Sequence, residues 1–337
     1  MRCSFRLFVA IAALVLAMPG RGTASECEAA GQLTFYTTQL ERDAKALGNA
    51  FARRCPSIDI HWVRAPAHDL YDMISDELDQ GGATADVVIL SSGLSMMKLK
   101  LAGRLKPLPD MDLETIRPEF YDAGRTFFAT KLITSVFVGR KTDAKPLPRS
   151  WAQLEGMAAE RRIAYPRVMT SYDARAFFLA IVNDPELGWA HVERLARAGV
   201  KPNSTLGRAA ADVVTDQADI GITADYLAVE LAQKGLPIAI SFPEDAAPVA
   251  AAPVGVISTT RNPVAARAFV AFILSRAWQV SVRSHGFIPV RSDIPTPPDF
   301  PDRQTMRFIM PDLTTAIVGS GTIYDRYLEI FGEGASD

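Results

Sequence analysis

Apolar residues along the chain follow two spacings, one typical of strands and one typical of amphipathic helices. Residues 31–38 (GQLTFYTT) and 58–63 (IDIHWV) alternate as strands, while residues 40–54 place apolar side chains at helical spacing. Residues 85–90 (ADVVIL) are apolar almost throughout, which is typical of a strand covered on both faces. Strands alternating with helices predict an α/β protein with a parallel-type sheet.

The alternation continues through the rest of the chain. Further strands are expected at 132–138, 162–165, 220–223, 238–242 and 254–258. Further helices are expected at 70–80, 93–101, 151–157, 173–183, 189–198, 209–215, 227–234, 262–275 and 313–331. Residues 289–311 contain six prolines, which excludes a regular helix or a central strand and predicts a path along the surface.

The first 25 residues have the order of a secretory signal. Two arginines precede an apolar run of twelve residues at 7–18, a Pro-Gly pair follows it, and no acid occurs before position 26. Twelve apolar residues fall short of the ~20 that span a bilayer as a helix. We therefore expect cleavage after residue 24 or 25 and export of the remainder to the periplasm.

Export changes the charge of the protein. The full chain has 337 residues, 36 basic and 38 acidic, for a formal net charge of −2. Removal of 25 residues takes three arginines and no acid, so the mature chain has 33 basic and 38 acidic groups and a net charge of −5. This balance argues against a nucleic-acid-binding protein, which needs a basic face. A length above ~300 residues predicts two domains.

Export also leaves two cysteines, Cys27 and Cys55, in an oxidising compartment. Cys27 precedes the first predicted strand, and Cys55 follows the first predicted helix. Because a helix antiparallel to its strand returns the chain to the strand's starting end, the two cysteines can meet. We expect a Cys27–Cys55 disulfide, with two unpaired thiols as the alternative.

The sequence lacks the usual motifs of catalysis. It contains no G-x-S-x-G elbow, H-E-x-x-H, P-loop or G-x-G-x-x-G, and no two cysteines have the spacing of a zinc cluster. The four histidines are scattered, and His191 lies in a charged helical segment where we expect it to be solvated. Triads can assemble from distant positions, so the scatter argues against an enzyme without excluding one. We expect that the protein is not an enzyme and that it holds neither a cofactor nor a resident metal.

Small hydroxyl residues follow several predicted strands. They are Thr37, Thr38, Ser91, Ser92, Thr170, Ser171 and Thr223. In open α/β sheets ligands bind beyond the carboxyl ends of the strands, where hydroxyls and free N–H groups at helix starts can hold an anion. The alternative for each residue is a helix cap.

Charged and aromatic residues near these strand ends are further candidates. Arg175 suits a phosphate or carboxylate best, because its planar guanidinium binds two oxygens at once. Asp225 and Tyr226 follow the strand that ends at Thr223. Other neighbours are Glu41, Arg42, Tyr172 and Asp173. For each of them a solvated helix face is the alternative.

Several segments, in this order, resemble the periplasmic solute-binding proteins of ABC importers, in the subgroup that binds ferric iron, phosphonates and sugar phosphates. They are LTFYTT (33–38), ADVVILSSGLSMMKLKLAGRLKPL (85–108), LPRSWAQL (147–154), RIAYPRVMTS (162–171), ADIGITADY (218–226), KGLPIAI (234–240), NPVAARAFVAFILSRAWQ (262–279) and GFIPVRSD (286–293).

The resemblance implies a type II periplasmic-binding fold, in which two α/β lobes with parallel-type sheets are joined by crossing hinge strands and close on a ligand. Lobe one would comprise 26–134 and 254–337, and lobe two 135–253, after a signal peptide at 1–25. The strand ends would line the cleft. The resemblance implies a monomer that captures a small oxyanion-bearing solute, such as an organophosphate or phosphonate, for an inner-membrane ABC permease.

Two alternatives stay open within this resemblance. Iron binders of the family present two adjacent tyrosines, whereas this chain has Ala224, Asp225 and Tyr226 there, so an iron site would need Glu41, Asp173, Asp225 and Tyr226. The segments 90–100, 241–258 and 262–275 also resemble the phosphoglycerate transport regulatory proteins, which act with a membrane sensor histidine kinase. That resemblance implies a ligand-sensing accessory.

Overall fold

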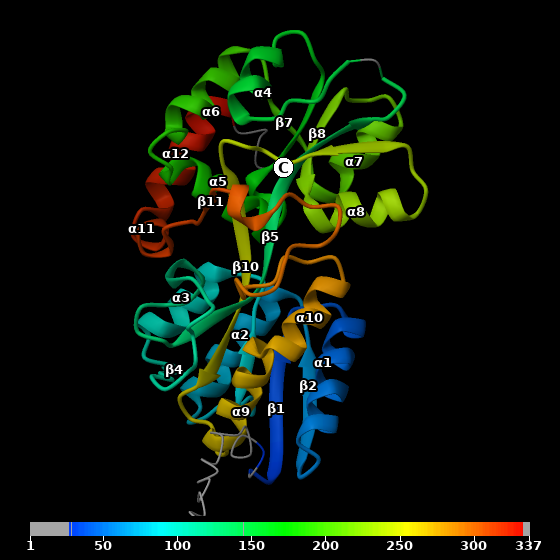
Figure 1. Ribbon diagram of the computed structural model, residues 1–337. Helices are drawn as coiled ribbons and strands as arrows, with labels where there is room; N and C mark the ends of the chain where they lie inside the picture. Colours follow the sequence, from blue (N-terminus) through cyan, green and yellow to red (C-terminus); the bar gives the residue numbers. More distant parts are fainter. Residues whose placement is uncertain (1–26, 28, 144, 333–337) are drawn as a thin grey trace, which may run out of the picture.

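The computed structural model describes residues 27, 29–143 and 145–332. The expected signal peptide lies outside the described residues. Two lobes, one above the other in Figure 1, are joined by the long strands β5 and β10. Within the described ranges, no helix is long and apolar enough to cross a membrane.

Helices and strands alternate as the apolar spacing predicts. The strands are β1 (Gly31–Thr37), β2 (Ile58–Arg64), β3 (Val87–Ile89), β4 (Leu105–Lys106), β5 (Phe127–Arg140), β6 (Ile163–Pro166), β7 (Pro202–Ser204), β8 (Ile220–Ala224), β9 (Ile238–Ser241), β10 (Ala247–Ile257) and β11 (Phe308–Ile309). The helices are α1 (Glu41–Arg54), α2 (Ala67–Asp79), α3 (Gly93–Leu101), α4 (Trp151–Met157), α5 (Tyr172–Asn183), α6 (Gly188–Arg197), α7 (Leu206–Val214), α8 (Asp225–Gln233), α9 (Pro263–Leu274), α10 (Arg276–Ser284), α11 (Leu313–Val318) and α12 (Ser320–Phe331). Short 3-10 helices occur at Pro118–Phe120, Val168–Thr170 and Arg303–Thr305.

Each lobe has its own parallel set of strands. In the first lobe β1 pairs in parallel with β2 and β3, and in the second β6 pairs in parallel with β7 and β8. The strands β5 and β10 are antiparallel to each other. Strand β5 is also antiparallel to β8 and β9, and β10 is antiparallel to β3 and β4 but pairs in parallel with β11. Both β5 and β10 run from one lobe into the other, so the carboxyl ends of the parallel strands face each other between the lobes.

Strand β10 is longer than the sequence predicts, because its alanines and two prolines do not form a recognisable strand pattern. The expected strand covers only 254–258, whereas β10 spans Ala247–Ile257. Alanine and proline are unfavourable in strands. Pro253 lies at the irregularity where the pairing with β5 shifts register, and a bulge is one of the few places where a sheet accepts proline.

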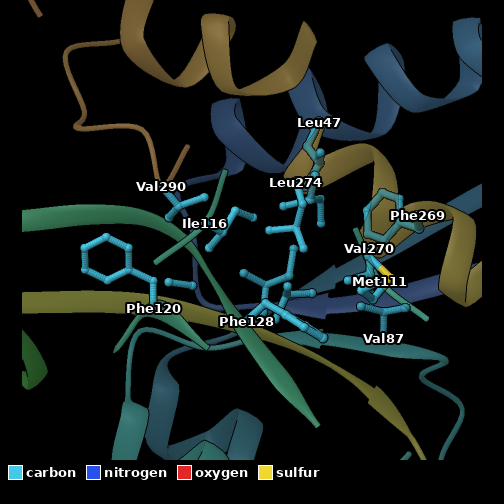
Figure 2. Packing of buried hydrophobic residues seen from close by; sticks show 14 of the residues in the cluster. Leu47, Val87, Met111, Ile116, Phe120, Phe128, Phe269, Val270, Leu274 and Val290 are labelled. Carbon is cyan, nitrogen blue, oxygen red and sulfur yellow. The ribbon is translucent and has the colours of Figure 1, made fainter. Parts of the chain in front are cut away.

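Aromatic side chains organise the core of the first lobe. The ring of Phe269 in α9 lies 5.0 Å from that of Phe35 in β1 and 4.9 Å from that of Phe51 in α1. Figure 2 shows Phe269 beside Val87 and Met111 in the same cluster. In the second lobe, the core packs around the fully buried Trp151, whose indole N–H donates to the carbonyl oxygen of Ala246.

The predicted disulfide is confirmed. Cys27 and Cys55 are bonded with an S–S distance of 2.03 Å and a Cα–Cα distance of 5.1 Å. The bridge joins the segment before β1 to the residue that follows α1. The bridge therefore links the start of β1 covalently to the end of α1 in the first lobe.

The structure differs from three expectations, two of them in the C-terminal region. Helix α12, expected in lobe one, packs on the second lobe, where the ring of Tyr327 lies 5.3 Å from that of Phe178 in α5. The proline-rich segment is also more buried than predicted, because its apolar residues, including Val290 and Phe308, complete the first-lobe core. His191 is fully buried and bonded to Glu155, not solvated. The other lobe limits expected from the sequence stay a prediction.

Candidate functional site

A cavity of about 280 Å³ lies between the two lobes. The first lobe contributes Ser91 and Ser92, which precede α3, and the first residues of that helix, and the second contributes Tyr172 and Arg175 of α5. Hinge residues of β5 and β10 and the segment 310–314 complete its wall. In Figure 1, α3 and α11 face each other across this junction of the lobes.

A second, more open hollow adjoins the cavity. It is lined by Ser91 from the first lobe and by residues 169–173 and Arg175 from the second. The tertiary structure therefore brings together Ser91, Ser92, Thr170, Ser171 and Arg175, which are distant in the sequence. Ser91, Tyr172 and Arg175 line both spaces.

The guanidinium of Arg175 lies at this meeting point. Ser171 caps α5 by accepting the backbone N–H of Ala174 at 3.0 Å, which sets the direction of the first helical turn. The guanidinium lies 5.9 Å from the ring centre of Tyr172, and its Nη2 is 3.5 Å from the sulfur of Met169. Its Nε is buried without a hydrogen-bond partner, and no carboxylate of the described residues forms an ion pair with it. A cation placed in this way can receive an anionic ligand.

Ser91 presents a hydroxyl close to this cation. Its backbone N–H donates to Thr38 Oγ1 at 2.7 Å, so the two strand ends are bonded to each other. Within the described part of the chain the Ser91 hydroxyl has no hydrogen-bond partner. Ser91 is half-buried and faces both hollows, where it can donate to a bound oxygen.

The other predicted hydroxyls have structural partners. Thr37 and Thr223 are fully buried, the first accepting the N–H of Gln39 and the second donating to the carbonyl oxygen of Leu206. Ser92 caps α3 just as Ser171 caps α5. Thr170 is exposed and donates to the carbonyl oxygen of Arg167. For these residues the structure shows the capping and packing roles, and ligand contacts through them stay a prediction.

A buried charged cluster lies beside the hinge strands. Asp225, the first residue of α8, is fully buried, and its carboxylate accepts the backbone N–H groups of Thr134 (3.1 Å) and Tyr226 (2.7 Å). Burial raises the pKa of Asp225 to about 8, and burial also raises the pKa of Asp173 to about 6.

Lys131 in β5 is the residue of this cluster that sequence reasoning missed. Its ammonium lies 3.7 Å from the ring centre of Phe287, and Asp43, Asp173 and Asp225 are the nearby acids. Burial lowers the pKa of Lys131. The sequence did carry a signal for Lys131, which is the single charged residue in the otherwise uncharged run 127–138. A lysine inside an apolar strand needs polar or charged partners.

The three acids of the iron alternative, Glu41, Asp173 and Asp225, are not gathered into one group among the described residues. Glu41 is exposed on α1, and in the part of the chain that the structure describes no group of three or more His, Cys, Asp or Glu residues can hold a metal ion. Burial raises the pKa of Tyr226, which disfavours the phenolate that Fe³⁺ requires. The ammonium of Lys131 adds a positive charge near Asp173 and Asp225.

The raised pKa of Asp225 predicts a pH-dependent stability. An unfolded aspartate titrates near pH ~4, whereas Asp225 in the folded protein titrates at about 8. The folded state therefore binds this proton more tightly, and its contribution to stability is lost as the pH rises through that range. We expect Asp225→Asn to gain stability relative to the wild type between pH 5 and pH 8 in urea unfolding. A difference between Asp225→Asn and wild type that stays flat with pH would contradict the assignment.

Residues 34–288 match the family described as Bacterial extracellular solute-binding protein. The chain belongs to this family. Membership in a solute-binding, non-enzymatic family agrees with the expectation that the protein is not an enzyme. No curated protein sequence matches this solute-binding protein.

Solved structures show the same fold. Iron-bound HitA from Pseudomonas aeruginosa matches with a TM-score of 0.70 and 21% identity, over 85% of this chain and 97% of HitA. The substrate-binding protein of an ABC transporter from Agrobacterium tumefaciens matches at 0.69 and 22%, over 90% and 94%. AfuA from Actinobacillus pleuropneumoniae, with exogenous fructose-6-phosphate bound, matches at 0.69 and 15%, over 90% and 99%. The type II periplasmic-binding fold is thus confirmed.

Proposed function

We propose that this solute-binding protein captures a small oxyanion-bearing solute, of the organophosphate or phosphonate type, between its lobes and delivers it to an inner-membrane ABC permease. The observation that carries the proposal is the unpaired guanidinium of Arg175, placed where both lobes contribute to the wall. The unbonded hydroxyl of Ser91 supplies a second donor from the opposite lobe. A ligand held by both groups would favour the closed state.

The charges of the protein support local recognition of the anion. The mature chain is acidic overall, so long-range attraction cannot bring an anion to the cleft. Charge-assisted hydrogen bonds from Arg175 act only at contact distance, and each contributes roughly 1.5–3 kcal/mol. Export through the predicted signal peptide would place the protein in the periplasm. The structural neighbours include an ABC substrate-binding protein and a sugar-phosphate complex, which agree with this proposal.

A ligand panel tests the proposal. We expect the melting temperature of the purified mature protein to rise with at least one organophosphate or phosphonate, because a ligand that binds only the folded state stabilises it by mass action. Isothermal titration calorimetry would then give the dissociation constant. Native mass spectrometry of the freshly purified protein would detect a retained solute. The absence of any shift across phosphates, phosphonates and carboxylates would refute anion capture.

Ser91→Ala is expected to weaken binding of the panel's best anion roughly 10-fold or more, because the ligand loses a hydrogen bond to a charged oxygen. The melting temperature without ligand should stay unchanged, since the Ser91 hydroxyl bonds no described residue. Ser95→Ala, further along α3 and outside both hollows, is the matched control. Equal affinities for the Ser91 and Ser95 variants would remove Ser91 from the site.

A further inference from the structure

The cavity behind Arg175 has a wall that is largely apolar. Side chains of Leu94 and Met97 from α3, Phe127 from β5, Leu179 from α5 and Leu313 from α11 line it. They come from both lobes and from the C-terminal region, so the cavity is a product of the assembled fold. Its volume of about 280 Å³ exceeds what a bare phosphate or methylphosphonate fills.

The carboxylates in this wall are already paired. Asp122 forms an ion pair with Lys100 and accepts the hydroxyl of Thr126 at 2.8 Å. Asp312 caps α11 by accepting backbone N–H groups. Glu119 is paired with Arg117. Asp122 and Glu119 are therefore paired with cations, whereas Asp312 keeps its charge and accepts hydrogen bonds from N–H and hydroxyl groups. Arg175 is the cation of this wall that has no carboxylate partner among the described residues.

A further apolar hollow of about 330 Å³ starts at the same arginine. Leu94, Arg175 and Leu179 line it together with Phe178, Tyr324 and other residues of α5 and α12. Leu94 and Leu179 therefore have apolar space on two sides, and the guanidinium lies at the polar edge of both spaces. An anion with a polar body would place its hydroxyls against these apolar side chains, where the hydroxyls would have no hydrogen-bond partners. Burying an unpaired hydroxyl costs free energy.

We propose that the solute is an amphiphilic anion, with a phosphonate, phosphate or carboxylate group at Arg175 and Ser91 and an aromatic or branched alkyl body in the cavity lined by Leu94, Met97 and Leu179. This inference rests on the proposed anion capture and narrows its ligand class. The headgroup supplies orientation through Arg175, and burial of the apolar body supplies selectivity over sugar phosphates.

Three small anions, two with a phosphonate and one with a phosphate-monoester headgroup, test the inference on the wild-type protein. Calorimetry would compare methylphosphonate, phenylphosphonate and glycerol 3-phosphate. We expect phenylphosphonate to bind about 10- to 100-fold more tightly than methylphosphonate, as burial of one aromatic ring predicts. Glycerol 3-phosphate should bind no better than methylphosphonate.

The outcomes separate the two proposals. Equal or weaker binding of phenylphosphonate, with binding of the other two anions retained, would overturn the apolar-body inference and leave anion capture standing. If none of the three anions bound and the wider panel of phosphates, phosphonates and carboxylates also gave no shift, anion capture itself would fail, and this inference with it. Binding of phenylphosphonate that survives Arg175→Gln unchanged would also overturn it, since the headgroup would then lie elsewhere.

A cavity-filling variant provides an independent test. Leu94→Trp should abolish most of the preference for phenylphosphonate over methylphosphonate, because the indole occupies the space of the phenyl ring. Leu101→Trp, on the same helix but 60% exposed and outside the cavity, should keep the preference. A preference unchanged in Leu94→Trp would place the phenyl ring outside this cavity and refute the inference.

Discussion

Replacement of Arg175 by glutamine is expected to weaken anion binding by at least about 100-fold. The guanidinium can donate two parallel hydrogen bonds to an oxyanion, and each charge-assisted bond contributes roughly 1.5–3 kcal/mol. Glutamine keeps a polar side chain but is shorter and has no charge. Arg175→Lys should recover only part of the affinity, since an ammonium retains the charge and loses the planar fork. Calorimetry with the best anion of the panel measures both losses.

Arg197→Gln is the matched control for this prediction. Arg197 lies in the last turn of α6 in the same lobe, is exposed and lines none of the hollows described above. The control has the same change of net charge, so any long-range electrostatic effect appears in both variants. Unchanged affinity in Arg175→Gln, or an equal loss in Arg197→Gln, would show that Arg175 does not hold the headgroup.

Loss of the disulfide is expected to destabilise the first lobe by roughly 3–4 kcal/mol. Cys27 and Cys55 are 28 residues apart, and a cross-link of this separation restricts the unfolded chain by about that amount in the loop-entropy description. The double variant Cys27→Ser with Cys55→Ser should therefore unfold at a lower urea concentration than the oxidised wild type.

Reduction of the wild-type protein offers the control for the disulfide. Dithiothreitol should move its unfolding curve toward that of the double serine variant and leave the variant's own curve in place. Coincident curves for oxidised wild type and double variant would mean that the bridge contributes nothing measurable. Ligand affinity should change little, since neither cysteine lines the cavity or the hollow beside it.

Much of the fold was predictable because it depends on local periodicity. The strand at 31–38 and the helix at 40–54 follow directly from their apolar spacing, and the disulfide follows from their succession. Segments that are held in place by tertiary contacts were not predicted from the sequence. The first half of β10 carries alanine and proline, yet it forms a strand because β5 and β11 pair with it. Helix α12 packs on the second lobe because its aromatic residues Tyr327 and Phe331 contact Phe178 of α5 and Tyr165 of β6 there.

The location of the site was predictable from the sequence, whereas its chemistry was predictable only in part. Strand ends marked Ser91 and Arg175 as candidates, because ligands bind beyond the carboxyl ends of parallel strands. The sequence could not show which hydroxyls cap helices, as those of Ser92 and Ser171 do, since capping depends on local hydrogen bonds. Lys131 was missed because its acid neighbours come from three different helices.

The sequence by itself determined the class of protein, the order of its elements, the cysteine pair and the hydroxyl-rich strand ends, because each is encoded within a short stretch of chain. Only the tertiary structure decided that the guanidinium of Arg175 stays unpaired and borders an apolar cavity. Pairing and cavity shape depend on side chains from α3, α5 and α11 that meet after both lobes have folded. The physical reason is that a charge acquires a function through what surrounds it, and its surroundings are assembled from distant parts of the chain.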